Sequence, residues 1–121
     1  MTIAQVSKLY GLSADTLRYY ERVGLIPDVR RSESGIRNYS EADCRWIEFI
    51  KCLRAAGLPI EALIEYVALA QAGDSTQNER MNLLMRERVK LAERIAEQQK
   101  TLKHLDEKIA FYQNSMKDVQ K

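Results

Sequence analysis

The chain has 121 residues, 45% of them hydrophobic, and a formal net charge of +2 at neutral pH. This length suits one small domain with an appendage, and the hydrophobic fraction is too high for a disordered chain. No stretch approaches the about 18 apolar residues of a membrane span, and the first residues lack the pattern of a signal peptide, so we expect a cytoplasmic protein without a membrane partner.

The two cysteines, Cys44 and Cys52, argue against two further classes of protein. They stand two helical turns apart on one predicted helix, which is too far for a disulfide within that helix. Neither their number nor their spacing matches a zinc site. We therefore expect no disulfide framework, no metal site and no cofactor.

The first two predicted helices form a helix-turn-helix. Thr2 can cap the first helix, with Gln5 placed as in a capping box. Gly11 ends that helix, and Ser13 caps the next one. Two capped helices joined by a short turn with a glycine are typical of this motif.

The second predicted helix carries side chains suited to DNA. Leu17, Tyr20 and Val23 have the spacing of an inward face. Arg18 can then reach a guanine edge or a phosphate, and Tyr19 can donate a hydrogen bond to a phosphate. An amphipathic surface helix with solvated charges is the alternative that this segment alone leaves open.

A basic segment with few apolar residues follows that helix. Gly24 caps the helix and Pro27 prevents its continuation. From Asp28 to Tyr39 the pattern predicts a short hairpin with its turn around Ser34-Gly35. Arginines on such a hairpin suit the phosphate backbone or the minor groove, whereas the alternative is a solvated loop.

Three stretches of this region together resemble the signature of the MerR family of bacterial transcriptional regulators. They are Thr16-Leu17-Arg18-Tyr19-Tyr20-Glu21, Gly24-Leu25-Ile26-Pro27 and Gly35-Ile36-Arg37-Asn38-Tyr39. The resemblance covers the whole chain. It implies a mainly α fold, in which a winged helix-turn-helix DNA-binding domain is followed by a long dimerisation helix that forms an antiparallel coiled coil.

The resemblance also implies which residues touch DNA. Arg18 and Tyr19 would do so from the recognition helix, and Arg37 and Tyr39 from the wing. The full set of expected DNA-binding residues is Thr2, Ser13, Thr16, Arg18, Tyr19, Tyr20, Arg37, Tyr39 and Arg54.

Two more helices complete the predicted DNA-binding domain, residues 1–73. Ser40 caps the third helix, and Pro59 starts the fourth, which runs from Ile60 to about Ala72. The resemblance makes this pair a second wing, whose turn at Gly57 approaches the phosphate backbone near Arg54. The apolar stripe expected to face the core from the third helix is Ala42, Trp46, Phe49, Ile50, Leu53 and Ala56.

Residues 77–116 are predicted to form one long coiled-coil helix. Its apolar seam alternates steps of three and four residues, as heptads do. A lone helix cannot bury such a seam, so we expect a homodimer. The seam is Met81, Leu84, Arg88, Leu91, Ile95, Gln98, Leu102, Leu105, Ile109, Tyr112 and Met116.

The resemblance implies a mechanism as well as a fold. The dimer would bind an inverted repeat in double-stranded promoter DNA, bend and untwist it, and so bring the promoter elements into register for RNA polymerase. Metal-sensing relatives place a cysteine near the start of the long helix, but this chain has no cysteine after Cys52. Its single histidine, His104, falls between seam positions, so a metal sensor is not expected.

Cys52 is the candidate sensor thiol. Its placement is similar to that in the single-cysteine AdhR/NmlR-like branch of the family, which responds to aldehydes and other electrophiles. A thiolate is the reactive form, which the charges of Lys51 and Arg54 favour and that of Glu48 opposes. In the alternative, Cys52 is a half-buried structural thiol in an effector-independent or small-ligand-responsive regulator. Cys44 is expected to face solvent on the opposite side of the helix.

Two other classes of function compete with that of a regulator. No histidine or carboxylate constellation accompanies Cys52 and no glycine-rich phosphate loop exists, so we do not expect an enzyme. An architectural DNA-binding protein, similar to excisionases, stays open at this point. An effector-dependent change in transcription separates it from a regulator.

Overall fold

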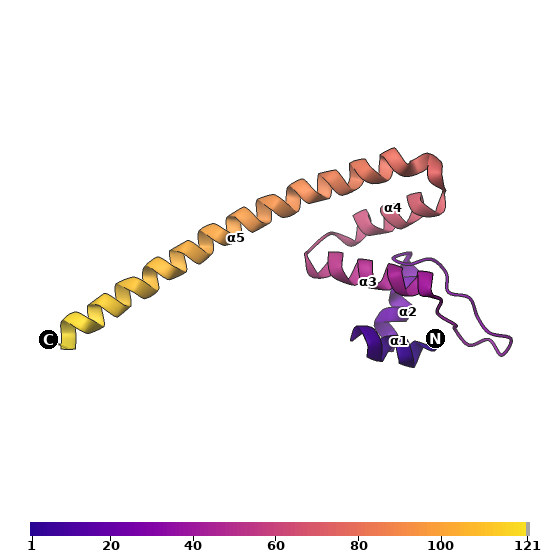
Figure 1. Cartoon of the computed structure of the whole chain (residues 1–121), viewed down its shortest axis with the longest axis horizontal. Coiled ribbons are helices and arrows are strands. Elements are labelled where there is room, and N and C mark those ends of the chain that lie inside the picture. The colour runs from indigo at the N-terminus through magenta and orange to yellow at the C-terminus, as the bar shows by residue number, and fades with distance from the viewer. Residues whose placement is uncertain (121) are drawn as a thin grey trace. The chain divides into compact units, whose positions relative to one another are not determined.

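The structure is a computed structural model that describes residues 1–120, with side chains as far as Lys117 (Figure 1). Helices dominate it, as predicted, and a long helix closes the chain. The chain divides into two compact units, Met1–Met85 and Arg86–Lys121, and each is described by itself below. Within the described residues, no helix combines the length and apolar character needed to cross a bilayer.

Helices α1 (Ile3–Tyr10) and α2 (Ala14–Val23) form the predicted helix-turn-helix. The Thr2 hydroxyl accepts from the Gln5 amide at 3.2 Å, and the Gln5 side chain accepts from the Thr2 amide at 2.8 Å, which confirms the capping box. Gly11 ends α1 at a φ of 66°, a conformation that suits glycine. The Ser13 hydroxyl caps α2 by accepting from the Thr16 amide at 3.0 Å.

The segment between α2 and α3 folds back on itself but forms only one bridge. Arg31 and Arg37 make a single antiparallel bridge, and the Gly35 amide donates to the Ser32 carbonyl at 2.9 Å to close the turn. Gly35 has a φ of 82°, as the predicted turn at Ser34-Gly35 requires. The side chains along this hairpin loop are mostly exposed, so little apolar burial supports a longer ladder.

Helix α3 (Glu41–Ala55) has the predicted cap at Ser40, and the predicted stripe packs against the core, but the most deeply buried face is turned away from the centre of that stripe. Its buried residues are Cys44, Ile47 and Ile50, whereas the predicted stripe contributes only Ile50 to that face. Apart from exposed Ala42, the other members of the stripe are half-buried: Trp46, Phe49, Leu53 and Ala56.

The reason for this shift is a second aromatic contact surface on α3. The rings of Trp46 and Phe49 lie 6.0 and 5.6 Å, centroid to centroid, from the ring of Tyr66 on α4 (Ile60–Gln71). The aromatic side chains therefore lie between Tyr66 and the core, while Cys44, Ile47 and Ile50 form the most deeply buried face. The periodicity of the sequence alone does not distinguish the two faces.

A fixed corner joins α4 to the last helix. A short 3₁₀ turn, Asp74–Thr76, follows Gly73 and leads directly into α5 (Gln77–Gln120). The buried Thr76 hydroxyl lies 2.6 Å from the Leu69 carbonyl and 2.8 Å from the Gly73 carbonyl, and Arg80 Nε donates to the same hydroxyl at 3.0 Å. The corner therefore ties the end of α4 to the start of α5.

One apolar core holds the first unit together. Residues from α1, α2, α3, α4 and the loop after α2 meet in it, so each short helix is stabilised by its neighbours rather than alone. Its most deeply buried side chains are Val6, Leu17, Leu25, Ile26, Ile47, Ile50, Leu63 and Val67.

Candidate nucleic-acid interface

The N-terminal end of α2 presents a polar surface. Arg18 is half-exposed, and its Nη1 lies 2.9 Å from the carboxylate of Asp15 one turn earlier. The Ser13 and Thr16 hydroxyls lie 2.8 Å apart at the helix end. A helix N-terminus with hydroxyls and an accessible guanidinium can bind a phosphate and read a base edge.

The two tyrosines of α2 have different environments. Tyr19 is half-buried, and the guanidinium of Arg22 lies 5.5 Å from its ring centroid, a cation–π distance. Tyr20 is only 7% exposed and belongs to the core. Burial raises the pKa of Tyr20 above its usual value, although the charge of Arg54 acts in the opposite direction. Of the pair, Tyr19 is the one placed at the surface.

Arg37 is held by an acidic side chain of α2. Its Nε donates to Glu21 Oε1 at 2.7 Å, and the amide of Val29 donates to Glu21 Oε2 at 2.9 Å. Burial raises the pKa of Glu21, but the hydrogen bonds from Arg37 and Val29 and the charges of Arg37 and Arg31 outweigh it, so the pKa lies below its usual value. Glu21 is therefore a carboxylate that joins three segments of the chain.

Tyr39 lies in the core and not on the hairpin surface. Its side chain is 2% exposed, and its hydroxyl has no hydrogen-bond partner in the part of the chain that the structure describes. Burial raises the pKa of Tyr39 above its usual value. Core packing leaves little of this ring accessible, and the same holds for Tyr20, so a DNA contact through either side chain stays a prediction.

The remaining expected contacts lie at the ends of helices. Thr2 is exposed, with its hydroxyl engaged in the α1 cap. Arg54 is exposed at the end of α3, and its Nη1 donates to the Leu58 carbonyl at 2.8 Å, across the turn at Gly57. Gly57 has a φ of 92°, which a side chain would strain. Arg54 thus stabilises the turn that joins α3 to α4.

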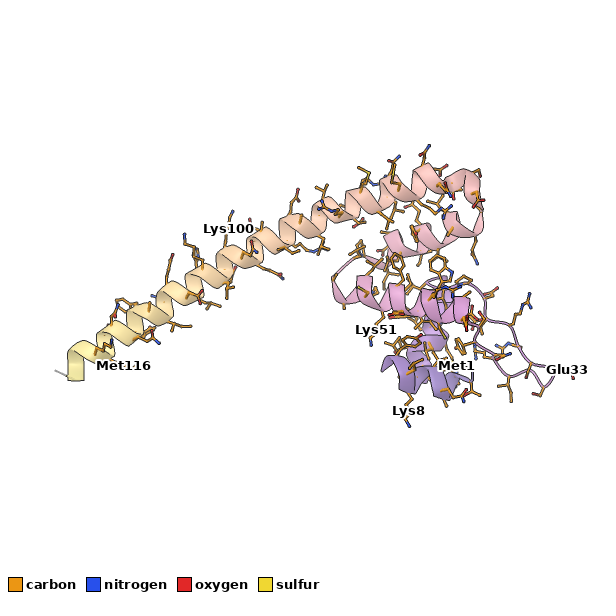
Figure 2. All side chains as sticks on the ribbon, viewed as in Figure 1. Met1, Lys8, Glu33, Lys51, Lys100 and Met116 are labelled. Carbon is orange, nitrogen blue, oxygen red and sulfur yellow. The ribbon has the colours of Figure 1, made fainter. Side chains whose placement is uncertain are left out.

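The two cysteines differ in exposure. Cys44 is buried, although it was expected to face solvent, and Cys52 is exposed, whereas the structural alternative for it was a half-buried thiol. The cause is the rotated core face of α3, to which Cys44 belongs. The ammonium of Lys51 donates to the Tyr10 carbonyl on α1 (Figure 2). Both cations beside Cys52, Lys51 and Arg54, are therefore engaged in hydrogen bonds with backbone carbonyls.

Sequence reasoning missed the role of Glu21. The residue belongs to the stretch that carries the family resemblance, but an acidic residue gave no signal as a DNA contact. Only the folded chain brings it within reach of Val29 and Arg37, eight and sixteen residues away. Among the described residues, no cluster of three metal-binding side chains occurs.

Comparisons with known proteins identify relatives along the chain. The family model described as MerR HTH family regulatory protein matches residues 1–69, and the one described as MerR, DNA binding matches residues 44–108. The chain is 63% identical over 93 residues to the HTH-type transcriptional regulator AdhR of Bacillus subtilis (strain 168). That alignment spans 77% of this chain and 66% of the relative, just under two thirds of its length.

Two solved structures share the fold over almost the whole chain. A MerR family transcriptional regulator from Listeria monocytogenes has a TM-score of 0.95 and 46% identity, covering 99% of this chain and 91% of that one. HiNmlR, described as a MerR family regulator lacking the sensor domain and bound to promoter DNA, has a TM-score of 0.85 and 34% identity. That match covers 93% of this chain and 90% of HiNmlR.

Proposed function

This chain belongs to the MerR family of DNA-binding transcriptional regulators, and we propose on that basis that it acts as a homodimer whose effect on a promoter depends on an electrophile that adds to Cys52. The first unit, Met1–Met85, would bind DNA, and the long helix would pair two copies. The role is binding rather than catalysis, since the relatives reported above are named as regulators.

The proposed DNA contacts come from α2 and the hairpin loop. Arg18, Thr16 and Ser13 lie at the N-terminal end of α2, where side chains of a recognition helix reach base edges and phosphates. Arg37 adds a cation from the hairpin loop. Tyr19, Thr2 and Arg54 remain candidates for phosphate contacts at the edges of this surface. The similarity to HiNmlR, which is described as bound to promoter DNA, supports the proposal that this surface binds DNA.

A dimer would place two such surfaces on one inverted repeat. We propose that the pair bends and untwists the promoter, and that RNA polymerase then engages both promoter elements. An effector that favours one of two dimer geometries could change transcription with little change in DNA affinity. This arrangement distinguishes the regulator from an architectural protein, which would not respond to an effector.

The exposure of Cys52 is the observation that carries the sensing proposal. A structural thiol would fill space in the core, and Cys44 has that position instead. The Cys52 thiolate can attack the carbonyl carbon of an aldehyde, forming a sulfur–carbon bond while the oxygen takes a proton from water. The adduct would sit on α3, one turn before the end of the helix.

Transcription in vitro from the bound promoter tests this proposal. With wild-type protein, adding an aldehyde should change the transcript level, and Cys52→Ser should abolish that change while keeping DNA affinity within about twofold, because surface substitutions rarely disturb folding. Mass spectrometry should find the adduct on Cys52. Cys44→Ala is the matched control and should keep the response. A Cys52→Ser protein that still responds would remove the sensing role, but not the assignment to the family.

A further inference from the structure

Glu21 links the recognition helix to the hairpin loop. Its two carboxylate oxygens accept separate hydrogen bonds, Oε1 from Arg37 Nε and Oε2 from the Val29 amide. Within the described part of the chain, these two hydrogen bonds are the ones that connect a side chain of α2 to the hairpin loop. The hairpin is closed by one bridge, between Arg31 and Arg37, and by its own backbone hydrogen bonds, and Glu21 adds the side-chain link from this loop to α2.

The pairing uses only one edge of the Arg37 guanidinium. Nε is engaged by Glu21, while the two terminal nitrogens make no hydrogen bond within the part of the chain that the structure describes. A guanidinium offers five donors in a fixed fork, so the terminal nitrogens can still bind one phosphate. The side chains of Arg37 and Glu21 are 22% and 13% exposed, so the pair is partly buried but remains accessible to solvent.

We propose that Glu21 is a positioning residue that strengthens DNA binding, because it holds Arg37 with its terminal nitrogens free for a phosphate. This inference rests on the proposed contact between Arg37 and DNA and adds the residue that prepares it. Without Glu21, the flexible side chain of Arg37 would have to be ordered at the moment of binding.

Removing the charge of Glu21 should change DNA affinity in the direction opposite to the one that charge repulsion alone predicts. Removing an acidic residue near DNA normally reduces repulsion and strengthens binding. Glu33 offers the comparison, since it is exposed at the far end of the same loop (Figure 2) and has no hydrogen bond or ion pair in the described structure. Glu33→Gln should therefore leave DNA binding unchanged or strengthen it, whereas Glu21→Gln, with the same change of charge, should weaken it.

The experiment measures fluorescence anisotropy of a labelled duplex that the wild-type protein has selected from a random pool. Wild type, Glu21→Gln, Arg37→Ala, the double variant and Glu33→Gln are titrated at several salt concentrations. Glu21→Gln and Arg37→Ala should each weaken binding about tenfold, and the double variant should be no weaker than Arg37→Ala. For a dimer that loses one phosphate contact per copy, the salt slope should fall by about 2.

Glu21→Asp separates position from charge and covers the case in which Glu21→Gln fails to fold. It keeps the carboxylate but shortens the side chain by one methylene group, so it too should weaken binding. Circular dichroism confirms that each variant is folded at the temperature of the titration.

Two results would overturn the inference. In the first, the Glu21 variants that fold bind DNA with wild-type affinity and a wild-type salt slope. In the second, the fold-loss of DNA affinity in the double variant equals the product of the fold-losses in the two single variants. If the wild-type protein selects no duplex at all, the DNA-binding surface proposed above fails, and the role of Glu21 falls with it.

Discussion

At several single positions of this protein, the chemical type of the residue does not predict its role. Glu21 is acidic but belongs to the candidate DNA interface, because its carboxylate binds the guanidinium of Arg37 and the amide of Val29. Tyr39 is polar at its tip but lies in the core. Cys44 and Cys52 share one helix, yet one is buried and the other exposed. Each assignment depends on neighbours that are distant in the sequence.

Tyr39→Phe tests the core position of this tyrosine. A buried hydroxyl without a partner carries a desolvation cost, so its removal should keep or raise the free energy of unfolding, by up to about 1 kcal/mol. Urea denaturation followed by circular dichroism measures this change. DNA affinity should stay within about twofold, because the ring is 2% exposed. A tenfold loss of affinity without loss of stability would instead show that the hydroxyl reaches DNA.

At the scale of elements, short polar corners fix how the helices follow one another. Gly11 and Gly24 end α1 and α2 with left-handed φ values of 66° and 86°, and both helices begin at a hydroxyl cap. At the far end of the first unit, Thr76 and Arg80 hold the corner between α4 and α5. These corners set where α2 and α5 begin.

Thr76→Val tests the corner between α4 and α5. Valine has nearly the same shape but loses the hydroxyl that contacts the Leu69 and Gly73 carbonyls and accepts from Arg80. Because Thr76 is buried, these groups would be left without this partner, and the free energy of unfolding should fall by about 1–3 kcal/mol. Chemical denaturation measures the loss. Ser75→Ala, at an exposed neighbour, is the control and should change stability by less than about 0.5 kcal/mol.

At the scale of the whole molecule, the long helix exposes a row of apolar side chains. Helix α5 has 44 residues and a length of about 66 Å. From Ile95 onward it carries exposed apolar side chains at heptad spacing, which a single helix leaves in water. They are Ile95, Leu102, Leu105, Ile109, Tyr112 and Met116, each between 46% and 58% exposed. A second copy of the same helix is the occupant that we propose for this seam.

Leu105→Glu tests the seam. A charge at this position should oppose pairing, and the dissociation constant of the dimer should rise at least about tenfold, since burying a leucine contributes about 1.5–3 kcal/mol. Sedimentation velocity over a concentration series measures the change. Asn114→Glu introduces the same charge at an exposed position opposite the seam, so it should leave the dimer intact. A wild-type protein that sediments as a monomer at high concentration would contradict the proposed pairing.

Local signals in the sequence determined the helices of this protein, their caps and the family resemblance. Hydroxyl caps, glycine ends and heptad spacing act over a few residues, so the caps at Thr2, Ser13 and Ser40 and the presence of the long helix α5 were readable directly. Tertiary structure alone decided which face of α3 enters the core, and hence that Cys44 is buried and Cys52 exposed. It also decided that Glu21 meets Arg37, because a contact across sixteen residues depends on how the whole chain packs and not on local spacing.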